Sequence, residues 1–428
     1  MRRAKAASMF SLGLSVSLVF LLSSSTLLFA GQSFLRAAAE TNVNQRYTIE
    51  SVSIAGVKVE NAKIPLSLRR RMTALVGERC DTTMLEDLAG DLRRQLHFQA
   101  VNHHLSKGSE PGRIRVNFDV IRKDVGFDLS VPKFLYSSSQ GWTGEVDAST
   151  HVREHEFTVG AINNGDTLPE RFSGVTARYE DSRVGSDRVR FGIAFENLHE
   201  QWSDQARAAA TGEAELYRTR RNIAPELTVA VAKNVTVSAG MSFEQLDSQS
   251  ANTRSANALT GEIHYGSKIE GGTAQQMVDA KYSVRVGVPK LGSDYSYSRH
   301  MVTLRYEVKS GRQSASDEFL GGMAEGDAPL FERFVLGNSS TLRGWDAAAI
   351  APLGANRVAH NSLTWGYQMG EGTAEVFYDA GALWRTGRPA PMRHSLGLGY
   401  RQKMFFMTMA FPITEGRMSP VFMAGMIY

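Results

Sequence analysis

The amino-acid sequence predicts a mainly β protein, in which one small α+β domain precedes a closed, membrane-spanning barrel of sixteen antiparallel strands. Three observations support this fold class. The N-terminus has the pattern of an export signal, and apolar and polar residues alternate with period two through most of residues 125–428. After the signal, no apolar run reaches the roughly 18 residues that a membrane-spanning helix needs. The mean hydropathy of −0.24 also argues against a helical membrane protein.

Residues 1–30 predict a secretory signal peptide. Three cationic residues come first, and an apolar, serine-rich stretch follows at 9–29. Small residues at 30–31 and again at 37–39 allow cleavage as late as residue 39. The alternative is an uncleaved anchor helix. We disfavour it because serines dilute the apolar run and no stop-transfer cluster of charges follows.

Charge and cysteine content exclude some classes of partner and cross-link. The formal net charge of +4 falls to +1 when the three cations of residues 1–30 are removed (4 − 3), so no nucleic-acid partner is expected. The single cysteine, Cys80, has no partner for an internal disulfide and is interpreted as a small packing residue. His155-Glu156 lacks the second histidine of a zinc-protease motif, and no G-x-S-x-G segment is present. We therefore predict no enzyme, no cofactor and no metal site.

Residues 45–124 predict the α+β domain, in the order β-α-α-β-β. Alternation indicates strands at 47–54 and 113–120, with a further strand beginning at Phe98. Pro65 can occupy the first turn of one helix. The second helix is marked by four leucines at helical spacing: Leu85, Leu88, Leu92 and Leu96.

Residues 125–428 predict the barrel. In the clearest strands one face is apolar and often aromatic, whereas the other carries charged, hydroxyl or glycine residues, as a lipid-facing wall around a wet lumen requires. A soluble sandwich can show the same alternation, but it rarely needs so long a chain. The predicted strands lie near 141–148, 155–162, 174–180, 188–196, 208–217, 227–232, 235–244, 259–265, 281–288, 301–308, 331–336, 361–369, 373–383, 394–401, 404–412 and 420–428.

Turn lengths give a check on this order. If both ends of the barrel chain face the periplasm, the turns after even-numbered strands should be short. The turns at 233–234, 370–372 and 402–403 follow the sixth, twelfth and fourteenth strands and are short. The long segment 309–330 after the tenth strand does not fit this rule.

The chain ends inside a predicted strand. Phe422, Ala424, Met426 and Tyr428 share one face of it. A barrel in lipid must pair its last strand with its first, because lipid offers no hydrogen-bond partner to free backbone groups. Phe422, Met426 and the terminal Tyr428 also resemble the C-terminal recognition segment of outer-membrane barrels.

Two segments carry more specific motifs. Residues 329–345 end in Leu342-Arg343-Gly344-Trp345, and residues 377–381 read Phe-Tyr-Asp-Ala-Gly. Together and in this order, they resemble the (V/L)RG(F/Y) tip of an inward-folded loop and the F-x-D-x-G motif of the thirteenth strand in the BamA/TamA superfamily of outer-membrane assembly and secretion barrels. Trp345 and Asn338 depart mildly from the family pattern. The resemblance implies these site residues: Leu342, Arg343, Gly344, Trp345, Phe377, Asp379 and Gly381.

The chemistry of this motif pair can be read from the residues. On the strand 373–383, Asp379 alternates with lipid-facing residues and so points into the lumen. A loop that dips inside can bring the guanidinium of Arg343 against this carboxylate in a bidentate pair. Gly344 permits a tight tip, and Trp345 is expected to pack against lumen residues.

The α+β domain resembles a POTRA domain, the module that precedes barrels of this superfamily. Residues 75–81 resemble its glycine-centred link between helices, whereas Leu96-His97-Phe98 lacks the usual glycine before the second strand. A generic small α+β domain is the alternative. An exposed edge strand of such a domain can bind an extended peptide by strand addition.

The resemblance implies a barrel in the outer membrane of a Gram-negative-type bacterium, with the POTRA-like domain in the periplasm. Its partners would be the lipid bilayer, client polypeptides and accessory periplasmic proteins or lipoproteins. The expected mechanism is sideways opening of the seam between the first and last strands, which offers an edge to a client strand. Two alternatives stay open: a two-partner-type secretion pore, which normally has two POTRA domains and a plug helix, and a passive porin or surface antigen without a client.

Overall fold

The structure is a computed structural model that describes residues 46–55, 66–95, 98–122, 125–211, 216–248, 253–271, 274–385, 391–413 and 419–427. The export signal expected at 1–30, the segment Leu96-His97 and the terminal Tyr428 lie outside these residues. The described chain forms two β-sheets, one of three strands and one closed into a barrel. None of the described helices is long and apolar enough to cross a bilayer.

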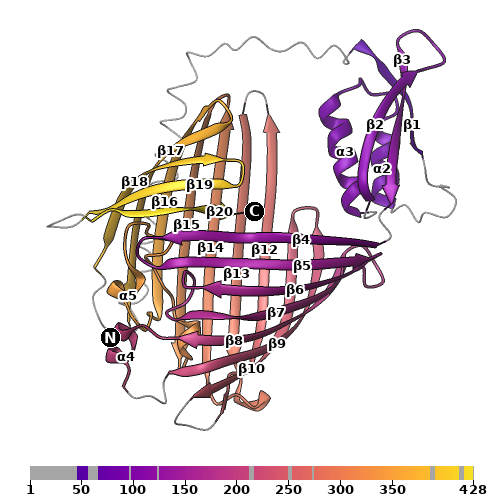
Figure 1. Cartoon of the computed structure of the whole chain (residues 1–428). Coiled ribbons are helices and arrows are strands. Elements are labelled where there is room, and N and C mark those ends of the chain that lie inside the picture. The colour runs from indigo at the N-terminus through magenta and orange to yellow at the C-terminus, as the bar shows by residue number, and fades with distance from the viewer. Residues whose placement is uncertain are drawn as a thin grey trace, which may run out of the picture.

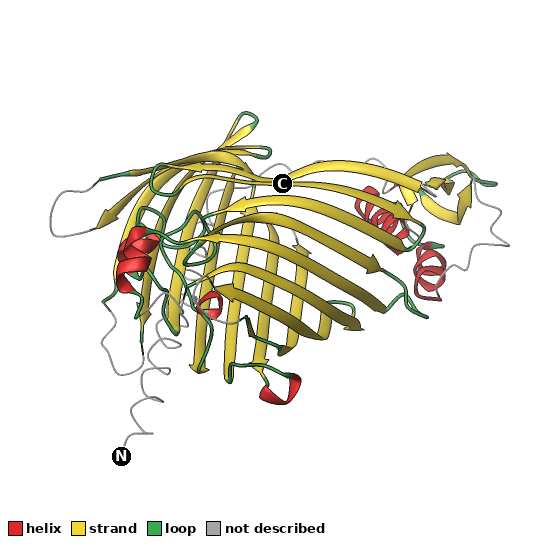
Figure 2. Ribbon diagram, turned by 60° about the horizontal axis from the view of Figure 1, so that its bottom comes forward, coloured by secondary structure: helices red, strands yellow, loops and turns green. Residues whose placement is uncertain are grey.

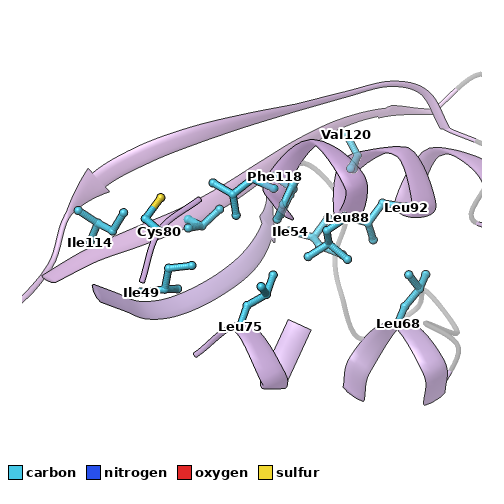
Figure 3. Close-up of a cluster of buried hydrophobic side chains, with 12 residues drawn as sticks. Ile49, Ile54, Leu68, Leu75, Cys80, Leu88, Leu92, Ile114, Phe118 and Val120 are labelled. Atoms are coloured by element: carbon cyan, nitrogen blue, oxygen red, sulfur yellow. The ribbon is translucent and has the colours of Figure 1, made fainter. Parts of the chain in front are cut away.

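The three-stranded sheet belongs to an α+β unit with the predicted order β-α-α-β-β. Its elements are β1 (Thr48–Ala55), α2 (Leu66–Leu75), α3 (Thr82–Gln95), β2 (Phe98–Lys107) and β3 (Arg113–Arg122). The sheet order is β1-β3-β2, with β1 parallel to β3 and β2 antiparallel to it. Phe118 of β3, Leu88 of α3 and Cys80 of the α2–α3 connection belong to one cluster of buried side chains (Figure 3). This core accounts for the leucine spacing and for the single cysteine.

The second sheet is a closed barrel of sixteen antiparallel strands, as predicted (Figure 1). A two-residue strand, β11 (Arg254–Ser255), adds to the edge of one of them. In the described part of the barrel chain, the short helical segments lie in connections between strands (Figure 2). The barrel strands are β4 (Val125–Ser137), β5 (Gly141–Val152), β6 (His155–Asn164), β7 (Arg171–Asp181), β8 (Val189–Gln201), β9 (Tyr217–Ala232), β10 (Val235–Ser248), β12 (Ala258–Gly271), β13 (Ala274–Gly287), β14 (Tyr297–Ser310), β15 (Gln313–Gly326), β16 (Arg357–Met369), β17 (Gly372–Trp384), β18 (Arg393–Gln402), β19 (Phe405–Ile413) and β20 (Val421–Ile427).

The total of sixteen is right, but two of the predicted strands are wrong. Of the described residues in 208–217, those at 208–209 end α4 (Asp204–Ala209), and Tyr217 alone belongs to a barrel strand. Residues 331–336 contain the end of a 3-10 turn, η4 (Leu330–Glu332), followed by irregular chain. The two strands that take their places are β4 and β15.

Both missed strands break the alternation on which the prediction depends. In β4 a bulge between Ser130 and Lys133 places two residues, 131 and 132, opposite the single residue 146 of β5. Residues that would face outward before the bulge therefore correspond to inward positions after it. In β15 the outward Asp317 and Gly321 interrupt the apolar face. Once β15 is recognised, the turn after β14 is Gly311-Arg312, which is as short as the parity argument requires.

The two faces of the barrel differ as expected. Large apolar side chains such as Phe127, Leu304 and Leu398 are exposed on the outside. Inward positions carry many ion pairs, for example Lys281 with Glu262. The wall is therefore apolar toward lipid and charged toward the lumen, which is the arrangement of a transmembrane barrel.

Candidate functional site

The site is built on the connection between β15 and β16, residues 327–356, which we call the inner loop. It contains η4 and one short helix, α5 (Ala347–Ile350). Its contacts are with inward-facing residues of the wall, and Leu336 and Leu342 are fully buried. The loop therefore occupies the lumen, and its residues 331–336 do not form the strand that the sequence predicted.

The tip of the loop, residues 337–345, has a constrained backbone. Asn338 Oδ1 accepts hydrogen bonds from the backbone N–H groups of Ser340 and Thr341, at 3.0 and 2.7 Å. Leu342 has a φ of 46°, which is uncommon for a residue with a side chain, and Gly344 has a φ of 95°. A side chain at Gly344 would also meet the β19 backbone near Ala410, so this position needs glycine for two reasons.

The guanidinium of Arg343 lies against the carboxylate of Asp379 on β17. Its Nε donates to Asp379 Oδ2 at 2.9 Å, and its Nη2 donates to Oδ1 at 2.7 Å. The backbone N–H of Arg343 also donates to Oδ2, at 2.9 Å. Ser362 on β16 joins the pair, because its hydroxyl accepts from Arg343 Nη2 and donates to Asp379 Oδ1. The carboxylate has no exposed surface, so this charge is fully paired within the protein.

The other predicted motif residues surround this pair. The Phe377 ring lies 3.5 Å from the Arg343 guanidinium carbon, in a cation–π contact. Gly381 makes room for Leu336 of the loop, whose Cδ1 would lie 3.0 Å from a Cβ at this position. Trp345 Nε1 donates to the carbonyl of His394 on β18 at 2.9 Å. The structure thus brings together the motif residues of the loop and of β17.

A second attachment holds the inner loop on a different part of the wall. The Phe331 ring lies between the guanidinium groups of Arg220 and Arg285, whose central carbons are 5.2 and 5.6 Å from its centroid. Glu332 forms an ion pair of 2.6 Å with Arg285 and accepts from Tyr297 Oη at 2.8 Å. These wall residues belong to β9, β13 and β14, whereas Arg343 binds β16 and β17. The loop is therefore held against two separate parts of the wall.

The barrel closes where β20 pairs with β4 (Figure 1). Among the described residues, this seam contains five residue pairs, from Met423↔Ser137 to Ile427↔Lys133, whereas β13 and β14 share fourteen. Of the predicted C-terminal signal, Phe422 lies beside the seam and exposes its ring, and Met426 pairs with Phe134. Tyr428 lies outside the described residues.

Comparison with known families settles the relationship. The model of the Omp85 superfamily domain matches residues 167–403, which is more than half of the chain. The chain belongs to the Omp85 superfamily. As an Omp85 barrel, the protein is an outer-membrane β-barrel of the assembly and secretion class, and the resemblance stated from the sequence is confirmed. None of the curated proteins compared with the chain matches its sequence significantly.

Solved structures agree with this Omp85 fold. BamA from Haemophilus ducreyi lacking POTRA domains 1–3 superposes with a TM-score of 0.59 at 14% identity, covering 89% of this chain and 84% of the other. CdiB from Acinetobacter baumannii gives 0.55 at 12% identity, covering 90% and 74%. CdiB from Escherichia coli gives 0.51 at 9% identity, covering 95% and 98%. At these identities the likeness concerns the fold.

Several site residues were not predicted from the sequence. Ser362 and His360 are inward positions of β16, and His360 Nε2 accepts from the backbone N–H of Leu342 at 2.9 Å. Alternation along β16 marks both as lumen-facing, but it does not say which loop they meet. Within the described ranges, no group of three or more His, Cys, Asp or Glu side chains is placed to hold a metal ion.

Proposed function

We propose that this Omp85 barrel assists the insertion or export of other polypeptides, by opening its seam and pairing a client strand with the exposed edge of β4. The proposal includes no covalent step. Membership of the superfamily supports the class of function. The client would be an extended or β-forming polypeptide, because only such a chain can pair with a strand edge.

The observation that carries the proposal is the incomplete pairing of β4. In the part of the chain that the structure describes, β20 pairs with residues 133–137 of β4, while residues 125–130 pair only with β5. In the described chain, the side of Leu129 and Ser130 that faces away from β5 therefore has no neighbouring strand. Such an edge is costly in lipid and favours pairing with another strand. Phe127 and Leu129 on this segment are each 70% exposed.

The α+β unit supports a role in receiving the client. Sheet order β1-β3-β2 leaves β2 with a single described neighbour, and a cavity of about 440 Å³ lies between α3 and β2. Arg93 and His103 are among the residues that line it. We propose that this unit lies in the periplasm and binds a client segment along β2 before the segment reaches the barrel.

The test is to lock the seam in lipid vesicles. Cysteines at Phe134 and Met426, which are opposite each other and face outward, can be joined by a short, reducible thiol cross-linker. We expect the unlocked protein to accelerate folding of an unfolded outer-membrane barrel into the vesicles. The cross-link should abolish this acceleration, and reduction should restore it.

A matched pair at Ala280 and Leu304 controls for cross-linking as such, because it joins two fully paired strands, β13 and β14. The parent protein controls for Cys80, which is buried. Full activity of the protein with the locked seam would exclude seam opening. Ion conductance with no assistance to any client would favour a passive porin, and export of one dedicated client alone would favour a secretion pore.

A further inference from the structure

Lys133 on β4, which pairs with Ile427 of β20, is turned into the lumen. It follows the bulge between Ser130 and Lys133, which reverses the inward and outward positions of the strand. Leu129 before the bulge is exposed, whereas Leu135 after it is 1% exposed and faces inward with Lys133. The bulge therefore aims a cation into the barrel at the point where seam pairing begins.

The partner of Lys133 is a buried carboxylate. Lys133 Nζ lies 2.6 Å from Asp166 Oδ2, in the connection between β6 and β7, and the Asp166 side chain is 1% exposed. A buried carboxylate needs a cation and hydrogen-bond donors to remain charged. Lys133 supplies the cation, so the ion pair fixes the position of the seam strand relative to this connection.

The donors to Asp166 come from the tip of the inner loop. The backbone N–H of Ser339 donates to Asp166 Oδ1 at 2.7 Å, and the Ser339 hydroxyl donates to Oδ2. Gln140, in the turn after β4, donates to the carbonyl of Gly337 at 3.2 Å. The loop tip is thus attached to the N-terminal side of the seam.

The same loop tip is attached to the C-terminal side. Arg343 binds Asp379 on β17, Trp345 binds the backbone of β18, and Gly344 packs against β19. Since β20 lies between β19 and β4, the loop tip spans the seam from within the lumen. The hydrogen bonds of Asn338 to the backbone of Ser340 and Thr341 lie between these two sets of attachments and constrain this part of the tip.

We propose that Lys133, Asp166 and Ser339 form a clasp that holds β4 against the inner loop, and so keeps the seam closed until a client engages it. Lys133 and Asp166 are positioning residues: they touch no client but set the distance between β4 and β20. Seam pairing consists of five residue pairs in the described chain, so the clasp adds a restraint where backbone pairing is weakest. The inference deepens the proposed function and rests on it for its biological role.

The test measures seam geometry directly in the full-length protein. Nitroxide labels at Phe134→Cys and Met426→Cys report the seam, and labels at Ala280→Cys and Leu304→Cys report a fully paired position. Pulsed electron spin resonance gives the distance distribution of each pair in lipid. We compare Lys133→Met and Asp166→Asn with Lys133→Arg, which keeps the charge. As a control, Lys281→Met removes the ion pair between Lys281 and Glu262, whose charged atoms are 2.7 Å apart and which lies in the lumen away from the seam.

We expect Lys133→Met and Asp166→Asn to add a longer-distance population at the seam pair only. Lys133→Arg should restore the narrow distribution, and Lys281→Met should leave it unchanged. An unchanged seam in Lys133→Met, or equal broadening at both label pairs, would overturn the clasp. If Asp166→Asn does not fold, the comparison of Lys133→Met with Lys133→Arg still tests the clasp. The measurement needs no client, so a widened seam in a protein that inserts nothing would uphold the clasp and refute the proposed function.

Discussion

Replacing Arg343 by alanine should destabilise the barrel by an amount that follows from the site geometry. The side chain donates to both oxygens of Asp379, at 2.9 and 2.7 Å, and to Ser362 at 2.8 Å. Removing one partner of a buried ion pair costs about 3–5 kcal/mol, because the remaining charge is uncompensated. Asp379 keeps two donors, the Ser362 hydroxyl and a backbone N–H, so we expect the lower end, about 3 kcal/mol.

The assay is urea unfolding in lipid vesicles, followed by tryptophan fluorescence and by the slower migration of unfolded barrel on gels. The double variant R343M/D379N removes the unpaired charge and should be more stable than Arg343→Ala alone. A free energy of unfolding for Arg343→Ala within about 0.5 kcal/mol of the wild type, the usual range of a surface substitution, would refute the reasoning.

Three further predictions concern other parts of the chain. Phe331→Ala should lower the free energy of unfolding by about 3 kcal/mol, as buried ring deletions do, and wild-type urea stability would contradict the second attachment. The backbone N–H of Ser109 lowers the pKa of Glu50, so this carboxylate stabilises the α+β unit above its ordinary pKa of 4.5 and loses that effect as the pH falls through the lowered value. Hydrogen exchange of the β1 amides should therefore depend less on acid pH in Glu50→Gln than in the wild type. An equal pH dependence in both proteins would exclude Glu50 as its source. Burial raises the pKa of the Cys80 thiol, so maleimide should label it only after unfolding, and rapid labelling of the folded protein would contradict its place in the core.

The sequence was sufficient to predict the parts of the fold in which pattern and environment agree. Along residues 281–286 of β13, outward Tyr282, Val284 and Val286 are apolar and the inward residues between them are polar, so alternation predicted this strand. The described leucines of α3 lie on its buried face, so their helical spacing predicted the helix. Arg343 and Asp379 were predicted to meet because a charge inside a barrel needs a partner and the motif pair named the two residues.

The missed elements have physical reasons. Residues 331–336 are rich in β-forming side chains, but Phe331, Glu332 and Phe334 are all buried, which suits a loop packed inside the lumen rather than a strand with one face in lipid. The clasp was not predictable, since Lys133 on β4 and Asp166 in the β6–β7 connection meet Ser339 only through the closed ring. The bulge that turns Lys133 inward leaves no periodic signal in the sequence.

The use of the β4 edge by a client can be tested most directly by site-specific photo-cross-linking during assisted folding. A photoreactive residue at Leu129 lies on the segment that β20 does not pair with, and one at Leu304 lies on the fully paired β14. We predict a covalent adduct with a folding client strand from Leu129 and none from Leu304. Accelerated client folding with no adduct at Leu129, or with equal adducts at both positions, would contradict templating at the β4 edge.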